Sequence, residues 1–488
     1  MIIYNRRPMP VSRTIARALA AASLVALMPV RAAAPPSDAL WNAWPAARVY
    51  PGDPFALKHA ALRAELARLA ERHPGLFRVD EEGVSAEGRT IPLLVVGSGP
   101  TTVLLWSQMH GDEPTATVAL LDVLNHLGAT RETPATQALL SKLTLAIIPM
   151  LNPDGAERTR RTNAQGIDIN RDAARLQSPE GRFLKSVRDR LKPSVGYNLH
   201  NQGPNTLAGP TGPQAAIALL AVPYDEAFTE NEGRRTTKRL AVLVHDLLEP
   251  WAPGRVSRYD TEYTARAFGD SMTRWGTPTL LIESGGFAAA GPEEAAALVR
   301  LNFVALLGTL RALADGSVAS VSASAYDAIP LNVRDRLFDV VVRHALVVGG
   351  GGLPPYLADV AWNAPATRPG FTGMAVGRGR GGAVLDVGDL DTYKGKTEID
   401  ALNKVLCVAP RGGEAAWAKA LEALRAKGAA TPDGTLTLSL EALSAEAKAW
   451  LEGAPALAPG YGGDFLLLAP AGEGRFKVER RLPVGAAP

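Results

Sequence analysis

The fold of this chain is most constrained by an alternation of short apolar runs with longer amphipathic stretches. The apolar runs lie at residues 91–96, 102–106, 143–148, 195–199 and 279–282. Helical periodicity occupies residues 56–72, 114–127, 179–191, 232–248 and 292–313. Such alternation predicts an α/β fold, in which a mainly parallel (mixed) sheet is flanked by helices.

A change of composition near residue 315 predicts a domain boundary. The 488 residues correspond to two or three domains of ordinary size. A stretch rich in Ser and Ala follows residue 315 and has the composition of a linker. Beyond it, strands are expected at residues 338–348 and 356–362, and helices at residues 415–427 and 440–451. We therefore expect a catalytic-type domain at residues 35–315, a linker at 316–330 and a smaller β-rich accessory domain at 331–488.

The N-terminus has the pattern of a secretory signal peptide. Four arginines precede an apolar run at residues 18–30, and small residues suited to cleavage follow it. The run is shorter than the roughly 20 residues that a membrane-spanning helix needs. We expect residues 1–34 to be removed on export to the periplasm or the medium, with no stable membrane insertion of the mature chain.

The charge balance argues against a nucleic acid partner. Removal of residues 1–34 takes away five arginines and no acidic residue, which leaves 47 basic residues against 49 acidic ones. A chain so close to neutrality lacks the basic excess typical of polyanion binding. Cys407 is the single cysteine, so no intramolecular disulfide is possible.

A first candidate metal-binding segment lies where an expected strand ends and an expected helix begins. It reads Gln-Met-His110-Gly-Asp-Glu113-Pro. Imidazole and carboxylate groups are the usual ligands of zinc where thiolates are absent, and a catalytic site takes three protein ligands. Taken alone, a His and a Glu three residues apart also fit an ordinary polar cluster at a strand end.

Five further segments follow in a characteristic order. They are Asn152-Pro-Asp-Gly155, then Arg161, then Gly166-Ile-Asp168-Ile-Asn170-Arg171, then Tyr197-Asn-Leu-His200 and finally Leu281-Ile-Glu283-Ser-Gly-Gly286. This order of motifs resembles that of the zinc carboxypeptidase family. The resemblance covers about residues 55–315 and implies a carboxypeptidase-like fold for the first domain.

The resemblance implies a single zinc site. His110, Glu113 and His200 correspond to the family's metal ligands, which predicts one Zn²⁺ per chain. A zinc site with three protein ligands leaves a position for a water molecule. Glu283 corresponds to the carboxylate that accepts the proton of this water and later passes it to the leaving amine.

The same comparison assigns roles around the metal. Arg161 is expected to polarise the scissile carbonyl and stabilise the oxyanion. Asn170 and Arg171 are expected to bind the terminal carboxylate of the substrate. Asp168 is expected to orient His110 from behind.

Three positions depart from the family pattern or leave it open. Family members commonly have a tyrosine near the substrate carboxylate, and Tyr259 and Tyr263 compete for this place, of which we favour Tyr263. Asp172 stands where Asn often follows the Asn-Arg pair, so it is expected to change how a carboxylate is received. If Asp270 lines the side-chain pocket, basic terminal residues would be preferred.

The sequence thus predicts an exported zinc-dependent peptidase of the carboxypeptidase type. Its expected substrates are peptides, or cell-wall (peptidoglycan) stem peptides, with a free C-terminal carboxylate. One alternative is a zinc deacylase of the succinylglutamate desuccinylase and aspartoacylase type, which shares the His-x-x-Glu start. Another is an inactive peptide-binding homologue, which would typically lack a ligand or Glu283.

Overall fold

The computed structural model describes residues 37–260, 262–287, 292–349, 353–364, 382–450, 457, 459 and 461–484. The predicted signal peptide, residues 1–34, lies outside this range. Two separate sheets, each with its own hydrophobic core, organise the described residues.

The first sheet has eight strands in the order β1-β2-β4-β3-β5-β9-β7-β8. Their bounds are β1 Phe77–Val84, β2 Thr90–Val96, β3 Thr101–Ser107, β4 Leu143–Ile148, β5 Val195–Asn201, β7 Ile217–Ala221, β8 Val256–Arg258 and β9 Thr279–Ser284. β4, β3, β5 and β9 run parallel to one another, and β7 runs parallel to β8. The remaining neighbours are antiparallel. The predicted mixed α/β sheet is therefore confirmed.

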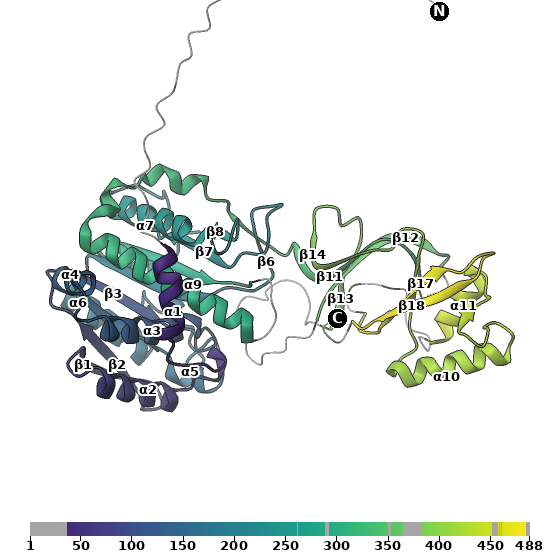
Figure 1. Ribbon diagram of the computed structural model, residues 1–488, viewed down its shortest axis with the longest axis horizontal. Helices are drawn as coiled ribbons and strands as arrows, with labels where there is room; N and C mark the ends of the chain where they lie inside the picture. Colours follow the sequence, from purple (N-terminus) through teal and green to yellow (C-terminus); the bar gives the residue numbers. More distant parts are fainter. Residues whose placement is uncertain are drawn as a thin grey trace, which may run out of the picture. The chain divides into compact units, whose positions relative to one another are not determined.

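Helices cover both faces of this sheet, as alternation along the strands requires (Figure 1). In β3, Val103 and Leu105 face one cluster of buried residues, while Leu104 and Trp106 face another. The first face is covered by α1 Ser37–Ala47, α2 His59–Arg72, α3 Thr115–Ala129, α4 Pro134–Lys142, α7 Glu232–Leu248 and α9 Pro292–Asp315. The second is covered by α6 Pro179–Leu191, η2 Ile169–Arg171 and α8 Phe268–Arg274. A short helix, α5 Pro153–Glu157, lies next to α2.

Helix α9 is the one described helix long and apolar enough to span a membrane by length and composition. Most of its apolar stretch is buried within the protein, against α3 and α7. A core helix of this kind passes the same test as a membrane span.

The segment after α9 packs on the first sheet, which differs from the flexible linker that its composition suggests. It forms the 3₁₀ helices η3 Ser317–Ser320 and η4 Ala323–Ala328 and the strand β10 Asn332–Arg334. Most side chains in this segment are small, but the large apolar side chains of Tyr326 and Ile329 are buried in the first core. β10 pairs with β6 Thr206–Ala208. The domain boundaries at residues 315 and 331 remain a prediction.

The second sheet lies in the β-rich C-terminal region that the sequence predicts. Its strands follow the order β13-β12-β11-β15-β17-β18-β16, with β14 also paired to β11. The bounds are β11 Leu337–Val348, β12 Tyr356–Asn363, β13 Ala383–Gly388, β14 Lys394–Asp400, β15 Val405–Val408, β16 Thr435–Leu436, β17 Phe465–Pro470 and β18 Phe476–Leu482. The helices α10 Gly413–Ala426 and α11 Leu440–Trp450 contribute side chains to its core.

Candidate metal centre and active site

The turn after β3 carries the first two candidate ligands. Gln108 adopts a left-handed backbone conformation with φ of 52°, which redirects the chain after the strand. Its side-chain amide donates to the Gly111 carbonyl at 2.9 Å and its oxygen accepts from the Thr117 hydroxyl at 2.9 Å. The turn is thereby fixed between β3 and α3, with His110 and Glu113 buried on it.

The end of β5 brings the third ligand to the same point. His200 Nδ1 lies 2.6 Å from Glu113 Oε2, and His110 Nδ1 lies 2.8 Å from Glu113 Oε1. The two imidazole nitrogens are 3.1 Å apart. His110, Glu113 and His200 each offer a ligand atom within 4.8 Å of the others, and all three are buried. Segments 87 residues apart in the chain therefore meet at one centre.

This arrangement fits a zinc ion. Zinc–nitrogen bonds of about 2.0–2.1 Å in a tetrahedral site place neighbouring ligand atoms about 3.3 Å apart. The two Nδ1 atoms lie 3.1 Å apart, close to this value, and each faces one oxygen of Glu113, at 2.8 Å from His110 and 2.6 Å from His200. The donor set of two imidazoles and one carboxylate is typical of catalytic zinc.

The charges of the ligands are strongly interdependent. Burial alone would lower the pKa of His110, but Glu113 and Asp168 outweigh it and raise this pKa to about 9. Burial would raise the pKa of Glu113, but the two histidines hold it well below its usual range. For His200, burial prevails over Glu113 and lowers the pKa. The protein thus keeps one buried carboxylate charged by surrounding it with imidazoles.

Glu283 lies beside this cluster on β9. Its Cα is paired with that of His200 across β5 and β9, so both side chains leave the sheet on the same face. Glu283 is 6% exposed, and its Oε2 has no hydrogen-bond partner among the described residues. Burial, and then the charge of Glu113, raise the pKa of Glu283 to about 8. Such an unpaired buried carboxylate is suited to exchanging a proton.

Asp168 and Arg161 both contact His110 and also contact each other. Asp168 Oδ1 lies 3.1 Å from His110 Nε2, on the side of the ring opposite to Glu113. Asp168 Oδ2 accepts from Arg161 Nε at 3.0 Å. Another nitrogen of Arg161 lies 3.1 Å from His110 Nδ1 and 3.4 Å from Glu113 Oε1. Arg161 therefore reaches the centre itself.

Asn152 joins the first ligand turn to the segment that carries Arg161. Its amide nitrogen donates to the carbonyls of Met109 at 3.2 Å and Arg161 at 3.3 Å. Its oxygen caps α5 by accepting from Gly155 N at 2.8 Å. A Cβ atom on Gly111 would lie 2.0 Å from the Gly155 carbonyl carbon, so the two turns touch backbone to backbone.

Asn170 and Arg171 lie on η2, near the start of α8. Asn170 Oδ1 accepts from Phe268 N at 2.9 Å, which leaves the amide group of Asn170 to donate. Arg171 is half-buried and directs one nitrogen to the Asn170 carbonyl at 2.7 Å. Arg266 Nε in turn donates to the Arg171 carbonyl at 3.2 Å. These contacts fix the pair to the segment that precedes β9.

Asp172, which the sequence predicts to change how a carboxylate is received, has its oxygens occupied by hydrogen bonds within its own loop. It is buried, and its oxygens accept from Gln177 N at 2.8 Å and from the amide and hydroxyl of Ser178, each at 2.7 Å. Asp270 is also buried and accepts from Thr264 N at 3.0 Å. Burial raises the pKa of Asp270 to about 6.

The two competing tyrosines have different surroundings. Tyr259 packs against the small cluster of Leu220, Val222 and Leu281, and Leu281 lies two residues before Glu283 on β9. Burial raises the pKa of Tyr259, and the charge of Glu283 raises it further. Tyr263 is half-buried, on the way to α8. The electrostatic link to Glu283 therefore belongs to Tyr259, whereas the sequence favoured Tyr263.

Sequence reasoning missed two other residues at the centre. Asn201 donates its backbone amide to Glu113 Oε2 at 3.2 Å and its side chain to the Thr115 hydroxyl at 2.6 Å, which orients the carboxylate. Asn201 follows His200 directly and could have been found from that position. Asp112 lies between the first two ligands, and burial raises its pKa to about 6.

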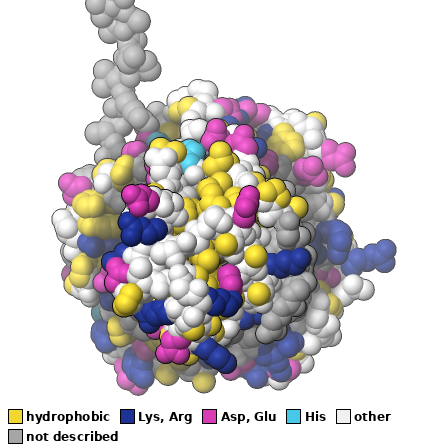
Figure 2. Space-filling view, turned by 90° about the vertical axis from the view of Figure 1, so that its right-hand side faces the viewer, with side chains coloured by type: hydrophobic (Ala, Val, Ile, Leu, Met, Phe, Trp, Pro, Cys, Tyr) yellow, Lys and Arg dark blue, Asp and Glu magenta, His cyan; other side chains and the backbone are white. Residues whose placement is uncertain are grey.

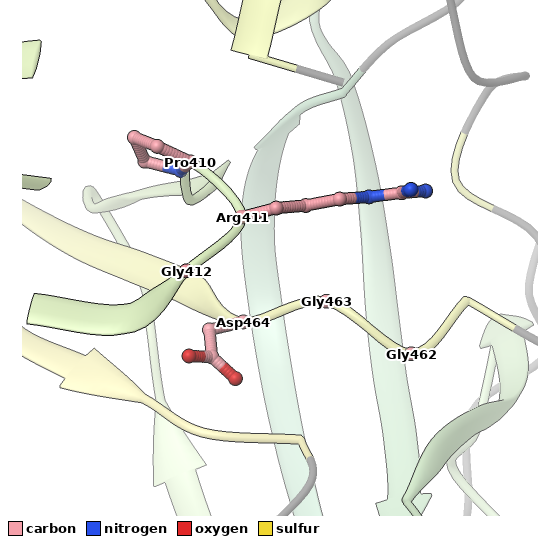
Figure 3. Close-up of a pocket in the computed structure, with 6 residues that line it drawn as sticks. All are labelled: Pro410, Arg411, Gly412, Gly462, Gly463 and Asp464. Atoms are coloured by element: carbon pink, nitrogen blue, oxygen red, sulfur yellow. The ribbon is translucent and has the colours of Figure 1, made fainter. Parts of the chain in front are cut away.

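Away from this centre, the C-terminal region contains a hollow of about 330 Å³. It is lined by Pro410, Arg411, Gly412, Gly462, Gly463 and Asp464 (Figure 3). Arg481 pairs with the Asp464 carboxylate, so that group is neutralised within the protein. On the face that Figure 2 shows, basic and acidic side chains lie intermingled.

The amino-acid sequence is similar to several characterised proteins. Residues 62–210 match the family model described as zinc carboxypeptidase. "Probable carboxypeptidase 2" of Arthroderma benhamiae is 27% identical over 242 residues, which cover 46% of this chain and 43% of that protein. "Carboxypeptidase E" of Caenorhabditis elegans is 33% identical over 142 residues, which cover 24% and 30% of the two chains. The matched part thus spans less than half the length of these relatives.

Solved structures of carboxypeptidases also align with this chain. The metallo-carboxypeptidase from Pseudomonas aeruginosa, in complex with (2-guanidinoethylmercapto)succinic acid, is 23% identical with a TM-score of 0.42 and covers 52% of this chain and 69% of that one. The matched segment contains His110, Glu113 and His200. The resemblance to the zinc carboxypeptidase family that the motifs indicate is therefore confirmed over residues 62–210.

Proposed function

We propose that this chain is an exported zinc-dependent carboxypeptidase. One observation carries the proposal: His110, Glu113 and His200 converge at a buried centre beside the unpaired carboxylate of Glu283. A structural zinc site has four protein ligands, whereas a catalytic one has three and a neighbouring base. The expected content is one Zn²⁺ per chain.

The roles of the residues follow from their positions. A zinc ion at this centre would supply Lewis acidity toward the scissile carbonyl and lower the pKa of a water molecule. Glu283 accepts the proton of the attacking water and passes it to the nitrogen of the leaving amine. Arg161 places its charge where the carbonyl oxygen becomes negative. Asp168 holds the ring of His110 in one orientation.

The substrate class follows from Arg171 and Asn170. A guanidinium and a free amide donor on one short segment are suited to a carboxylate, which accepts two or more hydrogen bonds. We therefore propose peptides with a free C-terminal carboxylate, among them peptidoglycan stem peptides that an exported enzyme would meet. The exported location rests on the N-terminal pattern of residues 1–34.

The test uses the purified full chain and N-acetylated dipeptides with either a free or an amidated C-terminus. We expect release of the C-terminal amino acid from the free form, and severe loss of rate with the amide. Elemental analysis should give about one zinc per chain. His200→Ala should lose both zinc and activity, while the half-exposed His245→Ala, as a matched control, should keep both. A chain that is active without bound metal would refute the proposal.

A zinc deacylase is the second candidate, because such enzymes share the His-x-x-Glu start. N-acyl amino acids carry a carboxylate but no peptide bond between two amino acids, so they separate the two functions. Faster hydrolysis of an N-acyl amino acid than of any dipeptide would favour the deacylase. Zinc binding and peptide binding without turnover of either substrate would identify an inactive homologue.

A further inference from the structure

Arg334 reaches the candidate site from a segment that follows the predicted catalytic domain. It ends β10, whose pairing with β6 sets Arg334 opposite Thr206, six residues beyond His200. Asn332 anchors the strand by donating to Gln202 Oε1 at 3.0 Å and accepting from Asp260 N at 2.8 Å. The strand is therefore held at the rim of the site by contacts on both sides.

The guanidinium of Arg334 lies over the ring of Tyr259. The distance from its central carbon to the ring centroid is 4.8 Å, and Nη2 donates to the Asp260 carbonyl at 3.0 Å. Tyr259 packs against a cluster that contains Leu281, and the side chain of Leu281 shares a face of β9 with Glu283. The guanidinium of Arg334 therefore covers the ring of Tyr259, which in turn packs beside the strand that carries Glu283. Its charge also lowers the pKa of Glu283, which burial raises.

The charge of Arg334 has no carboxylate partner within ion-pair distance among the residues that the structure describes. Arginine keeps its charge at all working pH values and binds carboxylates by paired hydrogen bonds. The side chain is exposed but held in place by the ring and the carbonyl, so little rotamer freedom remains to be lost on binding.

Arg334 and Arg171 belong to different parts of the rim. Arg171 is tied to Arg266 and lowers the pKa of Asp270, which places it at the start of α8. Arg334 is tied to Asp260 and Tyr259, which follow β8. If a peptide binds Arg171 through its terminal carboxylate and crosses Glu283 to the side of Arg334, the residue before the scissile bond lies nearest Arg334.

We propose that Arg334 is a specificity-determining residue that binds an acidic side chain on the N-terminal side of the scissile bond. The proposal rests on the function proposed above. It assigns to the segment after α9 a part in substrate selection. The preferred substrates are then peptides with Asp or Glu immediately before the C-terminal residue.

The test measures binding in the inactive Glu283→Gln full chain, so that it does not depend on turnover. The ligands are N-acetyl-Glu-Phe and N-acetyl-Gln-Phe, which differ only in charge before the scissile bond. We expect the Glu peptide to bind about tenfold more tightly, as for one charge-assisted contact. Adding Arg334→Ala should bring the ratio of the dissociation constants to about one, and Arg334→Lys should retain part of it.

Arg336→Ala removes an exposed arginine two residues away and should leave the ratio unchanged. A ratio near one in the Glu283→Gln chain, or a ratio that Arg334→Ala does not change, would overturn the proposal. If the ratio behaves as expected but the wild-type chain releases phenylalanine from neither peptide, the carboxypeptidase function fails while the acidic selectivity stands.

Discussion

The two sheets differ in what they bury. The first buries several ionisable groups on the face that carries the candidate site, among them His110, Glu113, His200 and Glu283. In the described part of the chain from Leu337 onward, the buried polar side chains are Asp359 and Thr435. The core of the second sheet consists instead of aliphatic side chains and rings such as Trp362 and Phe465.

The buried ionisable groups indicate that a reactive site belongs to the first sheet and not to the second. Burial of an unpaired charge costs several kcal/mol, so a fold retains a cluster of buried charges only where other interactions offset the cost. At the first sheet, the imidazoles and Glu113 offset one another, and a bound cation would stabilise the carboxylates further. The second sheet has the composition of a region stabilised by apolar packing.

Replacement of Glu283, the proposed catalytic carboxylate, should have the largest effect at the first sheet. Glu283→Gln keeps the shape of the side chain but cannot accept a proton, so we expect turnover to fall by about 10²–10⁴-fold with zinc content unchanged. The measurement is the rate of amino acid release, beside the zinc content. Glu82→Gln, on the exposed surface, serves as the control. Equal rates in the wild type and Glu283→Gln would contradict the assigned role.

Loss of a core side chain in the second sheet should lower the stability of the protein without changing zinc binding at the first sheet. Phe465 is fully buried, with ring centroids 5.8 Å from Trp362 and 5.4 Å from Tyr461. Phe465→Ala should lower the free energy of unfolding by about 3–5 kcal/mol. Leu357→Ala, at a 76% exposed position, should have little effect. Denaturant unfolding measures both, and loss of zinc from Phe465→Ala would break the contrast between the sheets.

His126 is a buried ionisable residue outside the candidate site, so it can be compared with the buried ionisable residues within the site. It lies on α3 with its ring edge against Phe303, and burial lowers its pKa to about 4. The unfolded chain therefore binds a proton more readily, so stability is present above about pH 6.5 and is lost as the pH falls toward 4. The loss is about 3 kcal/mol.

His126→Phe should remove this acid sensitivity. We expect the stability of the variant relative to the wild type to rise as the pH is lowered from 7 to 4, measured by denaturant unfolding at each pH. His245→Asn provides a half-exposed control. A relative stability that stays constant across this range would show that His126 is not the source.

Arg171 should have the smallest effect, confined to substrates with a free carboxylate. Arg171→Ala should lower kcat/KM for a free N-acetyl dipeptide by about 10–100-fold, as expected for a charge-assisted pair. The amidated dipeptide should be cleaved equally by both forms. Arg175→Ala, an exposed neighbour, is the matched control. Equal losses on both substrates would assign Arg171 to structure.

Much of the first sheet could be predicted because its strands are short apolar runs between amphipathic helices. The candidate ligands could be located because His110 and Glu113 follow β3 and His200 lies near the end of β5, and parallel strands bring these ends to one edge. Strand β1 was missed, since its charged and exposed residues lack an apolar face.

The remaining features depend on contacts that no local pattern records. The choice between Tyr259 and Tyr263 depends on which of them packs against the buried cluster that contains Leu281. Asp172 follows Asn170 and Arg171 directly, so the sequence placed it in the site. Its hydrogen bonds to Ser178 depend on the path of the loop, which the sequence does not reveal. The stretch after α9 has the composition of a linker because most of its residues are small. That composition does not reveal that Tyr326 and Ile329 are buried in the first core.

The contact between Gly111 and Gly155 limits how this part of the protein can vary. With no space for even a methyl group on Gly111, a larger residue there would push the turn of Gly155 away, whereas a Cβ atom on Gly155 would meet Asn152 and Thr162. That displacement would move a metal ligand on one side and the support of Arg161 on the other. A side chain at position 111 could therefore be accommodated only if the neighbouring turn moves with it, so the two turns behave as one mechanical unit.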